Sequence, residues 1–208
     1  MFVLLSLALI AALLIANELI WRKKDTHQEH QRKIIHIVVG SFAAFFPLYM
    51  SWTDIRLISL AFLVVVGLSK ALNIFSSIHQ VDRFSLGEIC FALAVGGLTF
   101  ITSTDWIYIA SLLQMSLADG LAAIVGVNFG KNNSYKVFGA TKSVVGSLTC
   151  FIVSLAILII TVLISNAHIN FWILVMASLI ATIVENIAVY GLDNLFLPLV
   201  VAVILSRV

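Results

Sequence analysis

The sequence predicts an all-α fold, a polytopic membrane helical bundle of about seven or eight transmembrane helices with its N-terminus outside. Of the 208 residues, 62% are hydrophobic and 11% are charged, whereas a soluble domain is nearer half apolar and a quarter charged. The mean hydropathy is +1.12. The apolar segments are continuous, which favours helices over a transmembrane barrel, whose strands alternate over about ten residues.

Eight apolar segments follow one another along the chain. The first, Met1–Trp21, lacks the basic start and the small-residue cleavage site of a signal peptide, so we expect a retained helix. The last, Asn194–Ser206, is short enough to be tilted or partly re-entrant. The connections are short, so we expect one membrane domain over residues 1–208. The other six segments are Ile34–Met50, Ile55–Leu72, Leu86–Thr102, Asp105–Val127, Ser143–Ser165 and Ile169–Val189.

Lysine and arginine predict the orientation of these helices. With the N-terminus outside, the outer side keeps only Arg56 and Arg207 of the 12 basic residues. Inner connections of membrane proteins carry the excess of positive charge. We therefore expect an integral protein of the cytoplasmic membrane of a prokaryote, with its active site facing the cytosol. The inner set is Arg22, Lys23, Lys24, Arg32, Lys33, Lys70, Arg83, Lys131, Lys136 and Lys142.

The stretch LADGLAAIVGVNFGK places an acid and three glycines at the end of an apolar run. A charged side chain at membrane depth is costly and tends to be functional, which singles out Asp119. A carboxylate can hold Mg²⁺, and the backbone at Gly120, Gly126 and Gly130, next to Lys131, could approach a phosphate closely. The alternative is that Gly126 and Gly130 form a GxxxG motif for helix packing.

The stretch KVFGATKSVVGSLTCF lies where the chain re-enters the membrane. Lys142 and Ser143 stand at the expected start of a helix, with Gly146 in its first turn. A helix N-terminus binds anions through its free N–H groups and its dipole, so this segment predicts a phosphate site. The alternative is a positive-inside anchor followed by a serine cap.

The stretch VENIAVYGLDNLFLP combines an acid within an apolar run with an acidic turn. Glu185 lies inside the run, and Asp193 and Asn194 stand between two helices. An aspartate with an asparagine can share magnesium ions in phosphoryl transfer. An ordinary turn would explain Asp193 but not Glu185.

Two further segments carry polar residues near the inner ends of helices. In RKIIH, Arg32 precedes an apolar helix with His36 one turn inside, and in LGEICF, Glu88 lies just within the fourth apolar segment. The alternative for RKIIH is an inside-facing charge with a hydrogen-bonded histidine.

Taken together and in order, these motifs resemble one family. The series RKIIH, LGEICF, DGLAAIVGVNFG, KSVVGS and E–(seven residues)–DNLFLP runs from Arg32 to Pro198 and is similar to the CTP-dependent lipid-alcohol kinases. That family includes phytol, farnesol and dolichol kinases and the fungal CTP-using diacylglycerol kinase. The resemblance implies transfer of the γ-phosphate of CTP, or of another nucleoside triphosphate, to an isoprenoid or other lipid alcohol in the membrane, with Mg²⁺ and without nucleic acid. The expectation of CTP rests on the resemblance alone.

The resemblance also assigns roles to the residues. Magnesium and the polyphosphate would be held by Asp119, Asp193 and Asn194. Phosphate oxygens would be neutralised by Lys142, Lys131 and Arg32. The rest of the nucleotide site would be Gly120, Gly126, Gly130, Ser143 and Gly146. The base for the lipid hydroxyl stays open among Glu185, Glu88 and His36.

Two other functions compete with a kinase. A CDP-lipid synthase of the phosphatidate cytidylyltransferase type looks similar around D-G-x-A-x-x-x-G and K-S, but its long C-terminal signature is missing here, because the chain ends soon after Pro198. A non-catalytic lipid transporter or binding protein would place polar residues at mid-depth, whereas here they gather on one side. Both comparisons favour the kinase.

Overall fold

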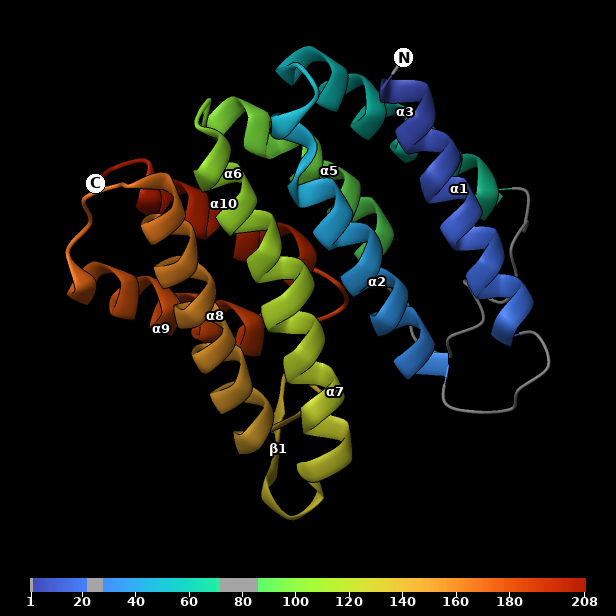
Figure 1. Cartoon of the computed structure of the whole chain (residues 1–208). Coiled ribbons are helices and arrows are strands. Elements are labelled where there is room, and N and C mark those ends of the chain that lie inside the picture. Colours follow the sequence, from blue (N-terminus) through green and yellow to red (C-terminus); the bar gives the residue numbers. More distant parts are fainter. Residues whose placement is uncertain (1, 22–27, 72–85) are drawn as a thin grey trace.

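The computed structural model describes residues 2–21, 28–71 and 86–208, which are mainly helical (Figure 1). The helices in the first half of the chain are α1 (Phe2–Trp21), α2 (Gln28–Ala44), α3 (Trp52–Ala71) and α5 (Gly87–Ile101). Those in the second half are α6 (Asp105–Leu113), α7 (Gly120–Phe129), α8 (Val144–Ser165), α9 (Phe171–Ile187) and α10 (Asp193–Leu205). Short 3₁₀ turns occupy Phe46–Leu48 and Lys131–Asn133. The expected helical architecture is therefore confirmed for the described chain.

Two helices of the described chain are long and apolar enough to cross a membrane. One is the continuous helix Asp105–Phe129, and the other is α8. Four shorter apolar helices accompany them. Large apolar side chains on the outside, such as Leu163, Ile164 and Trp172, are 70%, 76% and 71% exposed, as expected where lipid covers the surface. The number of spans and the side of the N-terminus stay predictions.

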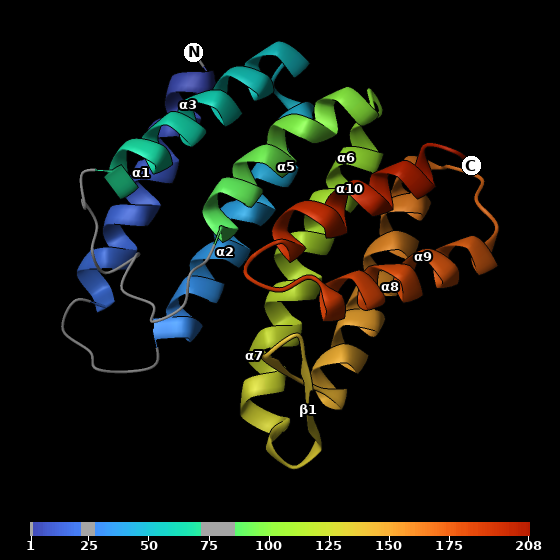
Figure 2. The ribbon, with the colours of Figure 1, turned by 180° about the vertical axis from the view of Figure 1, so that it is seen from behind.

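The helices pack in a chain of neighbours. α5 lies between α3 and α10, α7 packs against α8, and α8 packs against α9 (Figures 1 and 2). α2 packs along α6 and along the turn Gln114–Asp119 that follows it. Gly40 of α2 permits the close approach to this turn, because a Cβ there would lie 2.7 Å from the Cβ of Ser116. The core includes the fully buried Tyr108, Leu98 and Met115. This packing brings segments from both halves of the chain to the end of α7.

A π-helical turn, Gln114–Asp119, joins α6 to α7. Such a turn carries one residue more than an α-helical turn, so it rotates the residues of α7 by about 100° relative to an unbroken helix. Its polar side chains are buried and bonded to neighbouring helices: Gln114 donates to the carbonyl of Ser154 at 3.2 Å, and Ser116 shares a 3.3 Å hydrogen bond with Ser41. The turn ends at Asp119 and therefore sets the direction of that side chain.

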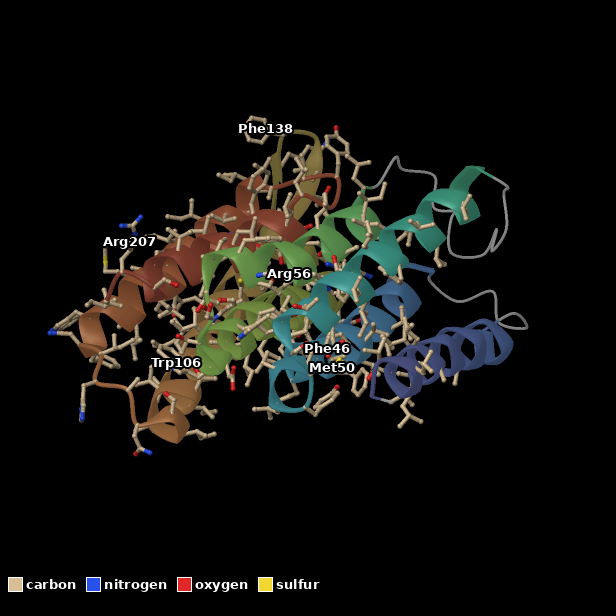
Figure 3. All side chains as sticks on the ribbon, turned by 90° about the horizontal axis from the view of Figure 1, so that it is seen from above. Phe46, Met50, Arg56, Trp106, Phe138 and Arg207 are labelled. Carbon is tan, nitrogen blue, oxygen red and sulfur yellow. The ribbon has the colours of Figure 1, made fainter. Side chains whose placement is uncertain are left out.

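A β-hairpin connects α7 to α8, and the predicted all-α class misses it. Strand β1 (Ser134–Val137) pairs with the antiparallel β2 (Ala140–Ser143). The two loop residues, Phe138 and Gly139, have φ of 45° and 82°, which is the signature of a type I′ turn. Phe138 is 73% exposed and projects from the tip of the hairpin (Figure 3). The helix expected from Ser143 begins one residue later, with Ser143 as its cap.

Candidate active site

A cavity of about 700 Å³ lies where the end of α7, the hairpin and the α9–α10 connection meet. Its wall contains nine of the residues that the sequence assigned to a site, together with Lys33 of α2. Positions as far apart in the chain as 33 and 193 thus face one space. The nine are Asp119, Gly126, Gly130, Lys131, Lys142, Ser143, Gly146, Glu185 and Asp193.

Asp119 is the most deeply buried acid of the cavity, with 1% of its surface exposed. Lys33 Nζ donates to its Oδ2 at 2.6 Å, and the lysine side chain itself is only 13% exposed. A buried carboxylate requires a counter-charge, because removing an ion from water costs several kcal/mol. The pair therefore stabilises an ionised Asp119 at the cavity wall.

Lys33 lines the cavity, although the sequence predicted for it only an inside-facing charge. The family resemblance gave the phosphate contact to the adjacent Arg32 instead, and the Arg32 side chain lies outside the described part of the structure. A usable signal was present, because Lys33, His36 and Gly40 have the i, i+3, i+7 spacing of one helix face. All three meet the π-helical turn or its last residue.

Lys142 and Glu185 form the second ion pair of the cavity. Lys142 Nζ donates to the backbone carbonyl oxygen of Glu185 at 2.8 Å and to the Oε1 of the same residue. The two side chains are 18% and 5% exposed. Burial alone would lower the pKa of Lys142, but the carboxylates of Glu185 and Asp119 outweigh it, and the pKa is raised above its ordinary value. Lys142 therefore remains a cation in the cavity wall.

Asp193 and Asn194 occupy different surroundings although they are adjacent. Asp193 lines the cavity, and its Oδ1 accepts a hydrogen bond from the backbone N–H of Asn194 at 3.0 Å. The Asn194 side chain points to α5, where its Nδ2 donates to the carbonyl of Gly87 at 2.9 Å. In this arrangement Asn194 ties α10 to α5, while Asp193 faces the cavity with Asp119.

The three candidate bases separate clearly. Glu185 lines the cavity, whereas His36 and Glu88 are not among its lining residues. The Nε2 of His36 donates to the carbonyl of Met115 at 3.2 Å, and its ring meets the edge of Phe91 at 5.6 Å between centroids. This is the hydrogen-bonded histidine of the alternative interpretation. Glu88 lies in the first turn of α5.

The glycines and the serine have packing roles beside their place in the wall. A Cβ on Gly146 would lie 3.0 Å from the carbonyl oxygen of Ala122, and a Cβ on Gly130 would lie 2.4 Å from the Cβ of Ser143. Ser143 caps α8 by accepting a hydrogen bond from the Gly146 N–H at 3.1 Å. The serine cap of the alternative interpretation is therefore present, and Gly130 is closely packed, whereas the positive-inside role of Lys142 stays a prediction. Gly120 packs on α2, because a Cβ there would lie 2.4 Å from Ile37 Cγ1.

The α9–α10 connection also forms part of the cavity wall, and the sequence did not predict this for Tyr190 and Gly191. Tyr190 and Gly191 line the cavity in the left-handed backbone region, with φ of 60° and 87°. The Tyr190 carbonyl accepts a hydrogen bond from the Leu86 N–H at 2.9 Å, which fixes the loop to the start of α5. The Tyr-Gly pair is a turn signal, but nothing in the sequence shows which way such a turn folds.

The donor groups of the cavity suit a magnesium–nucleotide complex. Among the residues that the structure describes, no group of three or more His, Cys, Asp and Glu could hold a metal ion by itself. Mg²⁺ usually takes only one or two protein carboxylates and completes its shell with phosphate oxygens and water. Asp119 and Asp193 supply that number of carboxylates.

The chain also resembles known proteins over most of its length. It is 31% identical over 203 residues to the phytol kinase of Synechocystis sp., covering 91% of this chain and 84% of the relative. The chain belongs to the phytol kinase family of lipid-alcohol kinases. This phytol kinase-like chain is also 28% identical over 199 residues to an uncharacterized protein of Rickettsia prowazekii, covering 86% and 93% of the two. No family model and no solved structure matches it.

Proposed function

We propose that this phytol kinase-like protein phosphorylates a membrane-embedded isoprenoid or related lipid alcohol, using Mg²⁺ and CTP or another nucleoside triphosphate. The observation that carries the proposal is the convergence of two ion-paired lysines and three acids in one cavity wall. They come from five elements: Lys33 from α2, Asp119 from the π-helical turn, Lys142 from β2, Glu185 from α9 and Asp193 from α10. Phosphoryl transfer depends on such positioning and charge stabilisation more than on covalent chemistry from the protein.

Asp119 and Asp193 would hold the metal together with the phosphates of the nucleotide. When bound, Mg²⁺ neutralises charge on the transferred phosphoryl group. Lys33 and Lys142 now neutralise carboxylates. A magnesium–nucleotide complex brings a cation for the carboxylates and an anion for the lysines. Each lysine can therefore exchange its carboxylate for a phosphate oxygen at little net cost in charge.

Glu185 is the best-placed base for the alcohol. Its carboxylate lies in the wall next to Lys142, so a lysine that turns towards phosphate leaves the carboxylate able to accept the hydroxyl proton. The alcohol oxygen forms a bond to the γ-phosphorus while the bond to the β–γ bridging oxygen breaks. The wall also contains the apolar Ala122, Val127 and Val189, which suit the first carbons of a lipid tail.

The simplest test is transfer of radiolabel. Purified protein with Mg²⁺, [γ-³²P]CTP and phytol, farnesol or dolichol is expected to yield labelled lipid, and a chelator should abolish the product. The same assay with [γ-³²P]ATP in place of [γ-³²P]CTP reports which nucleotide the protein prefers. Absence of labelled lipid with every alcohol and nucleotide overturns the proposal.

We further propose that the protein is an integral, multi-pass protein of the cytoplasmic membrane, with the cavity facing the cytosol. α8 has 22 residues, so it is about 33 Å long, near the roughly 30 Å of a bilayer core. The hairpin with Lys136 lies at one end of α8 and Asn166 at the other (Figure 1). A single cysteine at position 166 should react with an impermeant reagent added outside intact cells, and one at position 136 should not. The opposite pattern refutes the orientation.

A further inference from the structure

The hairpin that carries Lys142 is bonded to α9 through two facing residues. Tyr135 on β1 and Lys142 on β2 are direct cross-strand partners, so their side chains leave the same face of the hairpin. The two residues that receive them are consecutive at the end of α9. Lys142 bonds to Glu185, and the Tyr135 hydroxyl donates to Oδ1 of Asn186.

The Tyr135 contact belongs to a small hydrogen-bond network in which the orientation of the Asn186 side-chain amide is fixed. Asn186 Nδ2 donates to the carbonyl of Thr182 at 2.9 Å, which leaves Oδ1 facing the hairpin. Ser147, one turn into α8, has its Oγ 2.6 Å from the Tyr135 hydroxyl and 3.0 Å from Asn186 Oδ1. The network therefore joins β1, α8 and α9 beside the cavity.

A hairpin of this size needs such an anchor. Each strand has four residues, and an isolated two-stranded hairpin is at best marginally stable in water. On the other side of the strand Lys136 is exposed, and Phe138 projects from the tip. The position of Lys142 in the cavity wall thus depends on the contacts that fix the hairpin to the helices.

We propose that Tyr135, Asn186 and Ser147 form a clamp that positions Lys142 for the nucleotide. The proposal rests on the proposed function, in which Lys142 contacts phosphate. Tyr135 and Asn186 are not among the residues that line the cavity, so they are positioning residues that act through the hairpin. Tyr135 is tied to Lys142 by strand register, and Asn186 is tied to Glu185 by sequence.

The test is a nucleotide titration with Tyr135→Phe, which removes only the hydroxyl. A hydrogen bond of this kind is worth about 1 kcal/mol, so we expect the KM for CTP to rise about fivefold. The KM for the alcohol should stay within about twofold. A merely structural role would lower the amount of active protein and leave the nucleotide KM unchanged. Asn186→Leu, which removes the acceptor, should raise the nucleotide KM in the same way. Lys136→Ala, on the other face of β1, should not.

The link to Lys142 is tested by combining variants. The Kd for Mg²⁺–CTP, measured by calorimetry in nanodiscs, should rise for Tyr135→Phe in the wild-type background and change less than about twofold in the Lys142→Ala background. An equal rise in both backgrounds overturns the proposal, as does a wild-type nucleotide KM in both Tyr135→Phe and Asn186→Leu. Failure of the wild-type protein to label any lipid would instead refute the proposed function.

Discussion

Replacing Lys142 by alanine should lower both the thermal stability and the turnover of the protein, and a second substitution at Glu185 should separate the two effects. The substitution leaves the Glu185 side chain, 5% exposed, without its lysine partner. Breaking a buried ion pair from one side costs about 3–5 kcal/mol. Because the Lys142 side chain keeps 18% of its exposure, we expect the lower end of this range. About 3 kcal/mol corresponds to a fall in Tm of about 6–12 °C for a chain of this length.

The double variant Lys142→Ala/Glu185→Gln removes both charges and should recover most of the Tm that Lys142→Ala loses. Turnover should not recover. Loss of one group that stabilises transition-state charge costs on the order of a hundredfold, and the double variant also lacks the proposed base. The assays are thermal unfolding in detergent and a CTP titration. Lys136→Ala, which alters an exposed lysine of the same hairpin, is the control. If Lys142→Ala matches this control in both Tm and nucleotide titration, Lys142 is an anchoring charge and our interpretation of the cavity is wrong.

Four further substitutions test the metal site and the packing of a glycine. Asp119→Asn and Asp193→Asn should each lower turnover on the order of a hundredfold and raise the Mg²⁺ concentration needed for half-maximal activity; near-normal activity in either variant reassigns that residue to structure. Gly130→Ala forces a Cβ to within 2.3 Å of the Gly126 carbonyl oxygen, so thermal unfolding should show a loss of about 1–3 kcal/mol. Gly67→Ala, which meets nothing within 4 Å, should be neutral or slightly stabilising, and equal Tm values for the two variants would contradict the packing role.

Much of the candidate site could be predicted from the sequence, because a charged side chain within an apolar segment costs free energy and therefore stands out. Asp119, Glu185 and Lys142 stand out in the sequence because nothing around them offers a partner locally, and the structure pairs them across long separations. The depth of a residue along its helix can thus be read from the sequence. Its direction around the helix axis cannot, and for this reason Glu88, His36 and Glu185 were indistinguishable as bases.

Lys33 and the hairpin show which features the sequence left undetermined. Arg32 and Lys33 differ by about 100° around α2, so choosing between them required the phase that His36 and Gly40 supply. The hairpin strands have only four residues each, too short for a clear period of two. The π-helical turn leaves no composition signal at all, yet it sets the direction of Asp119.

The most direct test of the proposed kinase reaction traces both ends of the nucleotide. Purified protein is incubated with Mg²⁺, phytol and CTP that carries ³²P at the α-phosphate and ³³P at the γ-phosphate, and the lipid product is counted for both isotopes. Our account predicts ³³P on the lipid without ³²P, and loss of that signal in Asp119→Asn. Lipid that carries ³²P would contradict it and indicate transfer of a cytidylyl group. Unlabelled lipid, both with phytol and with farnesol or dolichol in its place, would contradict any phosphoryl transfer to lipid from CTP.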